Sequence, residues 1–539
     1  MTVVDDQSLE DGSFNSETST VAERAERAKA AFAAAVGEEW VIEGEPVARD
    51  FSDPYDTLQA PRSRGSYVVQ PGSVEEVRQI VRIANEHRVP LWTGSQGRNN
   101  GYGGAAPRVP GSVIVNLRRM NKVLEVNETF GYAVVEPGVS FAELNAYLLE
   151  NDIALWTSVP DLSWGSVLGN TLEHGLGYTP YGEHADQVCG MEIVLADGDL
   201  VRTGMGGQSN SKNFHTHQRG FGPRLDEMFM QSNFGIVTKM GLWMQPRPKA
   251  WRSVWIHATT DEAGYALVDA LRPLLMDGTI TNRVLIMNLT AILTALSKKE
   301  DWHDSTAPID DDVRAAMRAA YGLGNWNARI GLYGEPDRMD VDERLIREAV
   351  AHIPGTEYVS REYPGDVRHE DVFPPDQAVA GIPNMDLLRM LDWYGYERPG
   401  HVGFAPIFPL TSDDAREIHQ LLERGSARMG KDYGAAYALT ARSMLMLALI
   451  IYNAGDPEEV RRTFEVTGEM IAESAAMGYG EYRGHLQFMD RIADQFDFND
   501  HAQQRLNQRL KDALDPRGVL SPGKQGIWPS AGDFRRAGA

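Results

Sequence analysis

The feature that most constrains the fold is an alternation of strand and helix patterns that begins near Tyr67. A short apolar strand at 67–69 is followed by a Pro-Gly turn and by Ser73-Val74-Glu75-Glu76, a capping-box sequence that opens a helix. Apolar residues then recur at helical spacing, at positions 74, 77, 80, 81 and 84, and the next strand covers 89–93. This pattern predicts a βαβ unit.

The βαβ unit leads into a loop from Gly94 to Gly104 that contains five glycines. Glycines directly after a strand let successive backbone N–H groups converge on an anion such as a pyrophosphate. The loop matches neither G-x-G-x-x-G nor a Walker sequence. On its own, therefore, it is read more often as an ordinary surface turn than as a phosphate site.

The remaining sequence divides near Pro246-Arg247-Pro248, where the composition changes. Before this point we expect strands at 113–117, 123–126 and 132–136, a helix opened by a second capping box at Ser140, and a β-hairpin at Asp197-Gly198. From there to about residue 490, long helical patterns mixed with short strands indicate a second α+β domain. A non-helical segment at 523–529 closes the chain.

Composition and charge exclude several classes of protein. The 539 residues carry 76 acidic and 52 basic side chains, a net charge of −24 that repels phosphate backbones and anionic lipid. The single cysteine, Cys189, permits neither an internal disulfide nor a multi-cysteine metal site, and we expect no metal. The first 23 residues hold six acidic and no basic groups, so they predict a disordered acidic lead rather than a signal peptide. The longest apolar run, 444–452, is too short to span a membrane, and a cytoplasmic location is expected.

Six short motifs occur along the chain in an order found in one flavoprotein family. They are residues 97–108 (GRNNGYGGAAPR), 134–139 (VVEPGV), 160–162 (PDL), 165–171 (GSVLGNT), 177–182 (GYTPYG) and 231–238 (QSNFGIVT). From about residue 51 to 530 the chain resembles the vanillyl-alcohol oxidase and p-cresol methylhydroxylase family. Its nearest resemblance is to the phenol-oxidising branch, which includes eugenol oxidases and 4-ethylphenol oxidases.

The resemblance implies an α+β chain with the two-domain FAD-binding fold of the vanillyl-alcohol oxidase type. We expect an acidic lead and a first helix in residues 1–50 and an FAD-binding domain in 51–246. An α+β cap domain that covers the substrate is expected in 247–490, and a C-terminal segment returning to the FAD domain in 491–539. Because relatives are commonly dimers or larger, a homodimer or larger homo-oligomer is expected.

The resemblance also implies FAD as the cofactor, attached covalently through His401. This residue lies in Pro-Gly-His-Val-Gly-Phe, similar to the family segment whose histidine is bonded to the flavin 8α-methyl group. Neutral imidazole is a suitable nucleophile near physiological pH. Without the resemblance, one histidine among thirteen is more often a satisfied polar residue. The other residues expected at the cofactor are Gly97, Arg98, Asn99, Asn100, Gly101, Gly103, Pro160, Gly169, Asn170, His174, Gly175, Tyr178, Ile236, Val237, Arg483 and Lys524.

Three residues, Tyr102, Tyr482 and Arg483, resemble the clamp that holds a phenolate in this family. Removal of hydride from a benzylic carbon leaves a cation unless a para oxygen donates electrons to give a quinone methide, and a phenolate donates better than a phenol. A guanidinium and two phenolic donors favour that ionised form. Taken alone, a Tyr-Arg pair is usually a surface cation beside an aromatic ring.

Asp161 is the expected catalytic base. The resemblance places it beside flavin N5 and the reacting carbon of the substrate, where a carboxylate can move a proton. A turn or helix-cap aspartate is the alternative interpretation. The substrate pocket is expected at Leu176, Ala405, Ala436, Tyr437 and Ala438, and the two alanines predict extra room beside the phenol ring because recognisable relatives carry larger or polar groups there.

These features predict an FAD-dependent oxidase of para-substituted phenols such as 4-ethylphenol, eugenol-like compounds and vanillyl alcohol. Hydride transfer from the benzylic carbon to flavin N5 would give an alkenylphenol, alcohol or aldehyde through a quinone methide, with O₂ reduced to H₂O₂. The partners expected are a small phenol and O₂, without nucleic acid or membrane. Two alternatives remain open: a methylhydroxylase-type dehydrogenase that passes electrons to a carrier protein, and a non-catalytic FAD-fold binding protein.

Overall fold

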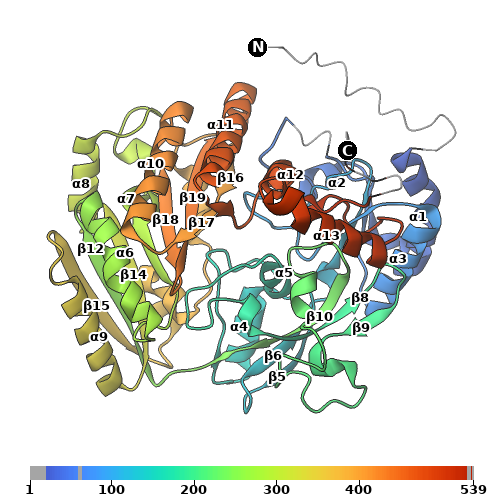
Figure 1. Ribbon diagram of the computed structural model, residues 1–539, viewed down its shortest axis with the longest axis horizontal. Coiled ribbons are helices and arrows are strands. Elements are labelled where there is room, and N and C mark those ends of the chain that lie inside the picture. Colours follow the sequence, from blue (N-terminus) through green and yellow to red (C-terminus); the bar gives the residue numbers. More distant parts are fainter. Residues whose placement is uncertain (1–19, 59–62, 531–533, 535, 537–539) are drawn as a thin grey trace.

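The computed structural model describes residues 20–58, 63–530, 534 and 536, so the acidic lead predicted at the start of the chain lies mostly outside the described residues. The chain forms two lobes (Figure 1). Of the described residues, the amino-terminal lobe holds those up to Pro246 and those that follow Glu481. The central lobe holds a second region, from Ala250 to Glu481, built on one large sheet. The domain limits given above stay predictions.

The first sheet of the amino-terminal lobe contains the predicted βαβ unit. Helix α3 (Val74–His87) connects β2 (Val68–Val69) to β3 (Leu91–Gly94), and both strands lie parallel to β4 (Val113–Asn116) in the order β1-β2-β4-β3, with β1 at Val41–Ile42. The helix buries the predicted apolar face, and α1 (Val21–Val36) packs in the same core. Ser73 caps α3 as expected, but the Glu76 carboxylate accepts from the N–H of Gly72 instead of completing the predicted box.

The second sheet of the amino-terminal lobe has the strand order β5-β6-β10-β8-β9. Its strands are β5 (Val123–Asn127), β6 (Tyr132–Val135), β8 (Val188–Val194), β9 (Leu200–Arg202) and β10 (Ile236–Trp243). The predicted hairpin joins β8 to β9, with Gly198 at φ 82° in the turn. Helices α4 (Phe141–Glu150) and α5 (Val167–Leu172) lie over this sheet, and α4 has the predicted capping box at Ser140.

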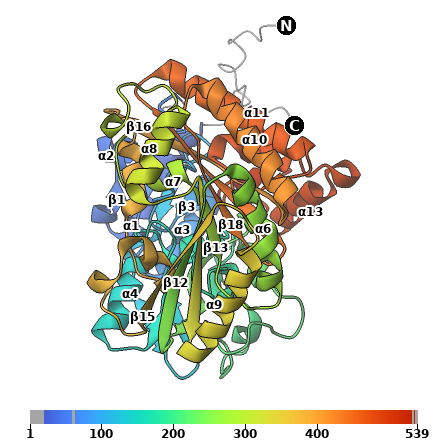
Figure 2. The ribbon, with the colours of Figure 1, turned by 90° about the vertical axis from the view of Figure 1, so that its left-hand side faces the viewer.

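The central lobe is a nine-stranded antiparallel sheet covered on one face by helices. Its order is β15-β12-β14-β13-β18-β19-β17-β20, and β16 also pairs with β19. The strands are β12 (Ala250–Ala258), β13 (Val284–Asn288), β14 (Trp326–Gly334), β15 (Thr356–Pro364), β16 (Pro399–Phe404), β17 (Pro406–Pro409), β18 (Gly434–Leu439), β19 (Ser443–Asn453) and β20 (Gly480–Glu481). Figure 2 shows the covering helices, α6 (Asp261–Met276), α9 (Pro336–Val350), α10 (Ser412–Met429) and α11 (Pro457–Ala476), beside the strands. The largest apolar core lies between these two layers.

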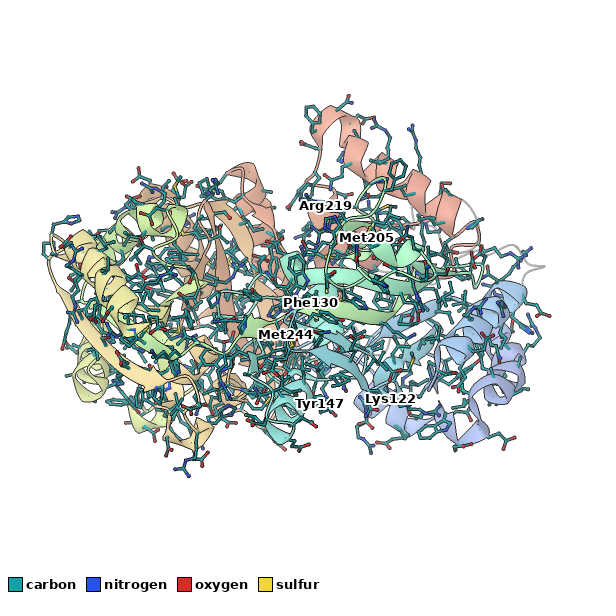
Figure 3. The ribbon with its side chains drawn as sticks, turned by 90° about the horizontal axis from the view of Figure 1, so that it is seen from below. Lys122, Phe130, Tyr147, Met205, Arg219 and Met244 are labelled. Atoms are coloured by element: carbon teal, nitrogen blue, oxygen red, sulfur yellow. The ribbon has the colours of Figure 1, made fainter. Side chains whose placement is uncertain are left out.

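The face of the central sheet opposite these helices turns toward the amino-terminal lobe. Alternate residues of its strands, among them Leu285, Ala436 and Ala438, form an apolar cluster with Leu176 and Tyr178 of the first lobe. Strands β7 (Leu155–Trp156) and β11 (Gln245–Pro246) pair where the chain passes between the lobes. Figure 3 labels Met244 at this junction and Phe130 in the nearby turn between β5 and β6. The functional site therefore has walls from both lobes.

The end of the chain returns to the amino-terminal lobe. Helices α12 (Met489–Ala493) and α13 (Phe498–Leu514), red in Figure 1, lie against it, and Leu520 pairs with Leu91 of β3. The fully buried ammonium of Lys511 forms an ion pair with Asp515 at 2.8 Å and donates to the carbonyl oxygens of Asn233 and Leu520. These bonds fix the C-terminal segment beside β3 and β10.

The remaining helices are short. They are α2 (Glu45–Asp50), α7 (Leu289–Leu293) and α8 (Asp311–Tyr321), together with several 3₁₀ turns. Among helices in the described part of the chain, none is long and apolar enough to cross a bilayer.

Candidate active site

A cavity of about 360 Å³ lies between the lobes and brings together most of the residues predicted from the sequence. Its lining combines the glycine-rich loop, the turn before α5, the start of β10, strands β16 and β19, and the segment after Ser521. Of the predicted residues it includes Gly97, Arg98, Asn99, Asn100, Tyr102, Pro160, Asp161, Gly169, Asn170, Gly175, Leu176, Ile236, Val237, His401, Ala405, Tyr482, Arg483 and Lys524.

The glycine-rich loop has the backbone that its sequence predicts. Gly97, Gly101, Gly103 and Gly104 have φ values of 70°, 77°, 104° and 58°, a region that only glycine adopts freely. Gly101 and Gly103 do not line the cavity themselves. A Cβ on Gly101 would lie 2.8 Å from His401 Nε2, so this glycine allows the loop to approach the central lobe. A Cβ on Gly103 would clash with Leu486, so this glycine allows the loop to approach the segment that follows β20.

His401 lies on β16 with one ring nitrogen committed to the backbone. Its Nδ1 is 3.2 Å from the carbonyl oxygen of Ile450, and because a carbonyl only accepts, Nδ1 carries the proton. The other nitrogen, Nε2, then has its lone pair free beside the glycine-rich loop. Burial lowers the pKa of His401 to about 4, so the imidazole is neutral at physiological pH.

Arg483, Tyr102 and Tyr482 form a compact group at the cavity wall. Cζ of Arg483 lies 4.1 Å from the ring centroid of Tyr102 and 5.7 Å from that of Tyr482. Burial raises the pKa of Tyr482 to about 12, although the guanidinium opposes this shift. Burial alone would lower the pKa of Arg483, but the two tyrosines and Glu173 raise it, so the cation stays charged. The Nε of Arg483 is buried without a hydrogen-bond partner among the described residues.

Asp161 faces the same cavity and is held from behind by Tyr178. The Tyr178 hydroxyl donates to Asp161 Oδ2 at 2.5 Å, and Arg329 Cζ lies 5.1 Å from the Tyr178 ring centroid. Burial raises the pKa of Asp161, while the Tyr178 hydrogen bond and the charge of Arg329 oppose that shift. Ser166, and not Asp161, caps α5, so the helix-cap interpretation of Asp161 is wrong. Tyr178 is fully buried and does not line the cavity, so its predicted direct contact with the cofactor is corrected to support of Asp161.

Asn170 is positioned by a neighbour that the sequence analysis did not identify. Its Oδ1 lies 2.7 Å from Nδ1 of His184, and burial lowers the pKa of His184 to about 3. A Cβ on Gly175 would lie 2.0 Å from Asn170 Oδ1, so only glycine fits there. His174, in the turn after α5 with φ 52°, lies outside the cavity lining.

The predicted substrate pocket divides between the two faces of the central sheet. Leu176 and Ala405 line the cavity. Ala436 and Ala438 belong to the same apolar cluster but are not among the lining residues, so their predicted place in the pocket wall is corrected to the apolar layer that includes this wall. Tyr437 points to the opposite face, because successive strand residues alternate. Its ring stacks on Trp326 at 4.9 Å between centroids, and its hydroxyl donates to Ala415 O. The prediction that Tyr437 lines the pocket is therefore wrong.

Several lining residues were not predicted from the sequence. Glu173 forms an ion pair with Lys524, and Gln231 donates to the carbonyl of Tyr482 at 2.9 Å. Gln231 lies within the quoted motif 231–238, but no isolated local signal marks Glu173. Three leucines also add apolar surface to the cavity wall: Leu447 and Leu449 of β19, and Leu387 of the 3₁₀ helix Asp386–Asp392.

The cavity fits a large polar cofactor such as FAD. Besides Arg483 Nε, three buried polar atoms of lining residues have no hydrogen-bond partner among the described residues: Thr93 Oγ1, Ser232 Oγ and Asn233 Oδ1. Buried polar groups in native proteins are nearly always satisfied, so these atoms indicate a ligand or ordered water. The positive-φ glycine loop adds backbone N–H groups for a phosphate.

Comparison with known proteins supports this interpretation. Residues 65–204 match the FAD binding domain family, and residues 414–525 match the C-terminal domain of FAD linked oxidases. The chain is 34% identical to the 4-cresol dehydrogenase [hydroxylating] flavoprotein subunit of Pseudomonas putida, over 92% of this chain and 94% of that protein. It is 29% identical to 1'-carboxy-chondrochloren decarboxylase of Chondromyces crocatus, over 86% and 91%.

Two solved structures share the whole architecture. A 4-ethylphenol oxidase from Gulosibacter chungangensis, in complex with isoeugenol, superposes with a TM-score of 0.89 at 36% identity, over 94% of this chain and 98% of that one. A p-cresol methylhydroxylase with substrate bound gives a TM-score of 0.88 at 32% identity, over 94% and 97%. With its predicted two-domain α+β fold confirmed, the chain belongs to the vanillyl-alcohol oxidase and p-cresol methylhydroxylase family of FAD-dependent oxidoreductases.

Proposed function

We propose that this protein oxidises para-substituted phenols at the benzylic carbon, with O₂ as electron acceptor and H₂O₂ as product. The observation that carries the proposal is the packing of Arg483 on Tyr102 and Tyr482 in the cavity that Asp161 also faces. When bound, FAD supplies the two-electron acceptor for the reaction. The glycine-rich loop, Asn170, Ile236, Val237, His401 and Lys524 would hold it.

Arg483, Tyr102 and Tyr482 select the ionised form of the substrate. A phenolate oxygen placed among them gains a charge-assisted hydrogen bond and the field of a buried cation, and bonds to charged groups contribute about 1.5–3 kcal/mol each. The unpartnered Nε of Arg483 leaves donor capacity for such an oxygen. Because the phenolate oxygen donates electrons to the ring, loss of hydride from the para substituent leaves a neutral quinone methide in place of a cation.

Asp161 moves the proton of the second half of the reaction. A carboxylate near the benzylic carbon can take a proton from the neighbouring carbon, which gives an alkene, or activate a water, which gives an alcohol. The cavity wall includes Leu176 and Ala405, which belong to one apolar cluster with Ala436 and Ala438, and this apolar surface disfavours water. We therefore expect 4-ethylphenol to give mostly 4-vinylphenol.

His401 is proposed as the covalent attachment site for FAD. Its neutral imidazole, with Nδ1 bonded to Ile450 and Nε2 free, has the protonation state that a nitrogen nucleophile requires. The family's cytochrome-linked dehydrogenases resemble this chain but use tyrosine for the attachment. A histidine here favours the oxidase over the dehydrogenase.

The relatives support a 4-alkylphenol as substrate. One is named a 4-cresol dehydrogenase and another a 4-ethylphenol oxidase. The proposed clamp suits a phenol whose para substituent carries a benzylic C–H bond. Candidate substrates are 4-ethylphenol, 4-propylguaiacol, eugenol and vanillyl alcohol. A panel of these compounds, read out by peroxide formation, tests the proposal. Absence of flavin reduction by every phenol in the panel would reject it.

A second candidate is a dehydrogenase that passes electrons to a carrier protein. The 34% identity to a 4-cresol dehydrogenase flavoprotein subunit favours it. The two differ in the rate at which the reduced enzyme reacts with O₂. A stopped-flow trace that mixes substrate-reduced enzyme with air-saturated buffer separates them, since an oxidase is reoxidised within its turnover time.

A further inference from the structure

Glu173 contributes a negative charge to the cavity that the proposed reaction does not use. Among described lining residues the carboxylates are Asp161 and Glu173, and the cations are Arg98, Arg483 and Lys524. Glu173 Oε1 forms an ion pair with Lys524 Nζ, and Oε2 accepts from Gln525 Nε2 at 3.1 Å. The carboxylate therefore joins the turn after α5 to the C-terminal segment.

This ion pair lies at the clamp end of the cavity. The side-chain amide of Gln231 donates to the backbone carbonyl of Glu173 at 3.5 Å and to that of Tyr482 at 2.9 Å, so Glu173 adjoins the clamp. Together with the two tyrosines, the charge of Glu173 raises the pKa of Arg483. Because the oxidant must reach a substrate held by the clamp, the reacting end of the flavin would lie in the field of Glu173.

The backbone around the pair is constrained at several non-glycine residues. Positive φ values occur at His174 (52°), Gln231 (41°), Ser521 (38°) and Gln525 (52°). Residues other than glycine rarely adopt a backbone conformation with positive φ, and it persists only where the surrounding structure imposes it. The position of Glu173 relative to Lys524 is therefore fixed by the fold and not by the chance meeting of two surface chains.

We propose that Glu173 sets the electrostatic potential at the reacting end of the flavin site by neutralising Lys524. Two carboxylates, Asp161 and Glu173, face two cations, Arg483 and Lys524, among the described residues at this end. Loss of the Glu173 charge leaves an excess cation, which stabilises negative charge on a reduced or adducted flavin. Glu173 thereby lowers the flavin midpoint potential. The inference requires FAD binding, which the family establishes, and is independent of which phenol is oxidised.

Sulfite titration of the holoenzyme tests this without turnover, because sulfite forms an anionic adduct with oxidised flavin and bleaches its absorbance. Glu173→Gln keeps the size and an acceptor oxygen but removes the charge. We expect sulfite to bind about tenfold more tightly and the midpoint potential to rise by about 30 mV, the value of a tenfold change for two electrons. Lys524→Gln should shift both quantities by a similar amount in the opposite direction. The double variant should return close to wild type.

The matched control is Glu192→Gln. Glu192 also bonds a lysine and an arginine, Lys239 at 2.8 Å and Arg202 at 2.9 Å, but does not line the cavity. It should leave sulfite affinity within about twofold of wild type. A purely structural tether would make Glu173→Gln and Lys524→Gln shift in the same direction, and either that result or an unshifted Glu173→Gln would overturn the proposal. The absorbance change reports only flavin-bound protein, so partial flavin loss does not hide the answer.

Discussion

Replacing Tyr178 with Phe removes one hydroxyl from behind Asp161 and leaves the rest of the pocket in place. Tyr178 is fully buried, its hydroxyl donates to Asp161 Oδ2 at 2.5 Å, and its ring packs in the apolar cluster and under Arg329. Phenylalanine preserves the ring contacts. The variant therefore tests whether the hydrogen bond sets the protonation state of the proposed base.

The size of the effect follows from the type of bond. A hydrogen bond to a charged group contributes about 1.5–3 kcal/mol, and one pKa unit corresponds to about 1.36 kcal/mol. The bond favours the ionised carboxylate, against burial, which raises the pKa of Asp161. Without it, we expect the pKa of Asp161 to rise further.

The assay mixes the enzyme with 4-ethylphenol anaerobically in a stopped-flow instrument. It measures the rates of flavin reduction and of product formation as a function of pH. The active base is the ionised form, which exists above the pKa of Asp161. Raising that pKa moves the acid limb of the profile to higher pH and leaves the plateau at alkaline pH nearly unchanged. Loss of a bond worth about 1.5–3 kcal/mol corresponds to a displacement of the acid limb by about one to two pH units.

Tyr333→Phe is the matched control. Tyr333 packs against the same apolar cluster and is half-buried, but its hydroxyl donates to the carbonyl of Val379 at 2.6 Å and not to Asp161. Its removal should leave the acid limb where wild type has it. If Tyr178→Phe also leaves the limb unmoved, Asp161 is not the titrating base, and the reasoning fails.

Three further predictions concern the clamp, the cofactor link and the base itself. Acid-precipitated wild-type protein should stay yellow while His401→Ala releases its flavin; a wild-type supernatant that takes all the colour contradicts the covalent link. Methylation of the phenol oxygen should abolish turnover, and Arg483→Ala should lose more activity than Arg483→Lys, which keeps a cation but not the planar fork; equal rates for ether and phenol would refute the clamp. Asp161→Asn should fold and bind FAD but lose about 10²- to 10⁴-fold in product formation, measured by single turnover; a wild-type rate would remove Asp161 from the mechanism.

Local structure could be predicted because its causes are local. The helix from 74 to 87 follows from a capping serine and an apolar face at helical spacing, and the β8–β9 hairpin follows from Asp197-Gly198. The motifs also identified the family, since six short sequences in one order are improbable without common ancestry. The helix and hairpin signals each lie within one short segment, whereas the six motifs are spread over residues 97–238.

The sequence did not show which face of a strand or loop turns toward the cavity. Alternation along β18 establishes that Ala436 and Ala438 share a face and that Tyr437 lies on the other. Which face meets the cavity depends on the helices α6 and α10 that cover Tyr437, and these come from distant segments. Tyr178 likewise lies in a recognisable motif, but only the packed structure turns its hydroxyl toward Asp161.

The sequence by itself determined the α+β class and the glycine-rich loop, and it supplied the side chains that are proposed to react. The tertiary structure alone decided which of them meet. Arg483 reaches Tyr102, and Lys524 reaches Glu173 across 351 residues, because the C-terminal segment pairs with β3 while the central sheet closes over the first lobe. Long-range contacts of this kind carry no local signature, since they arise from burial of shared apolar surface and depend on the whole chain at once.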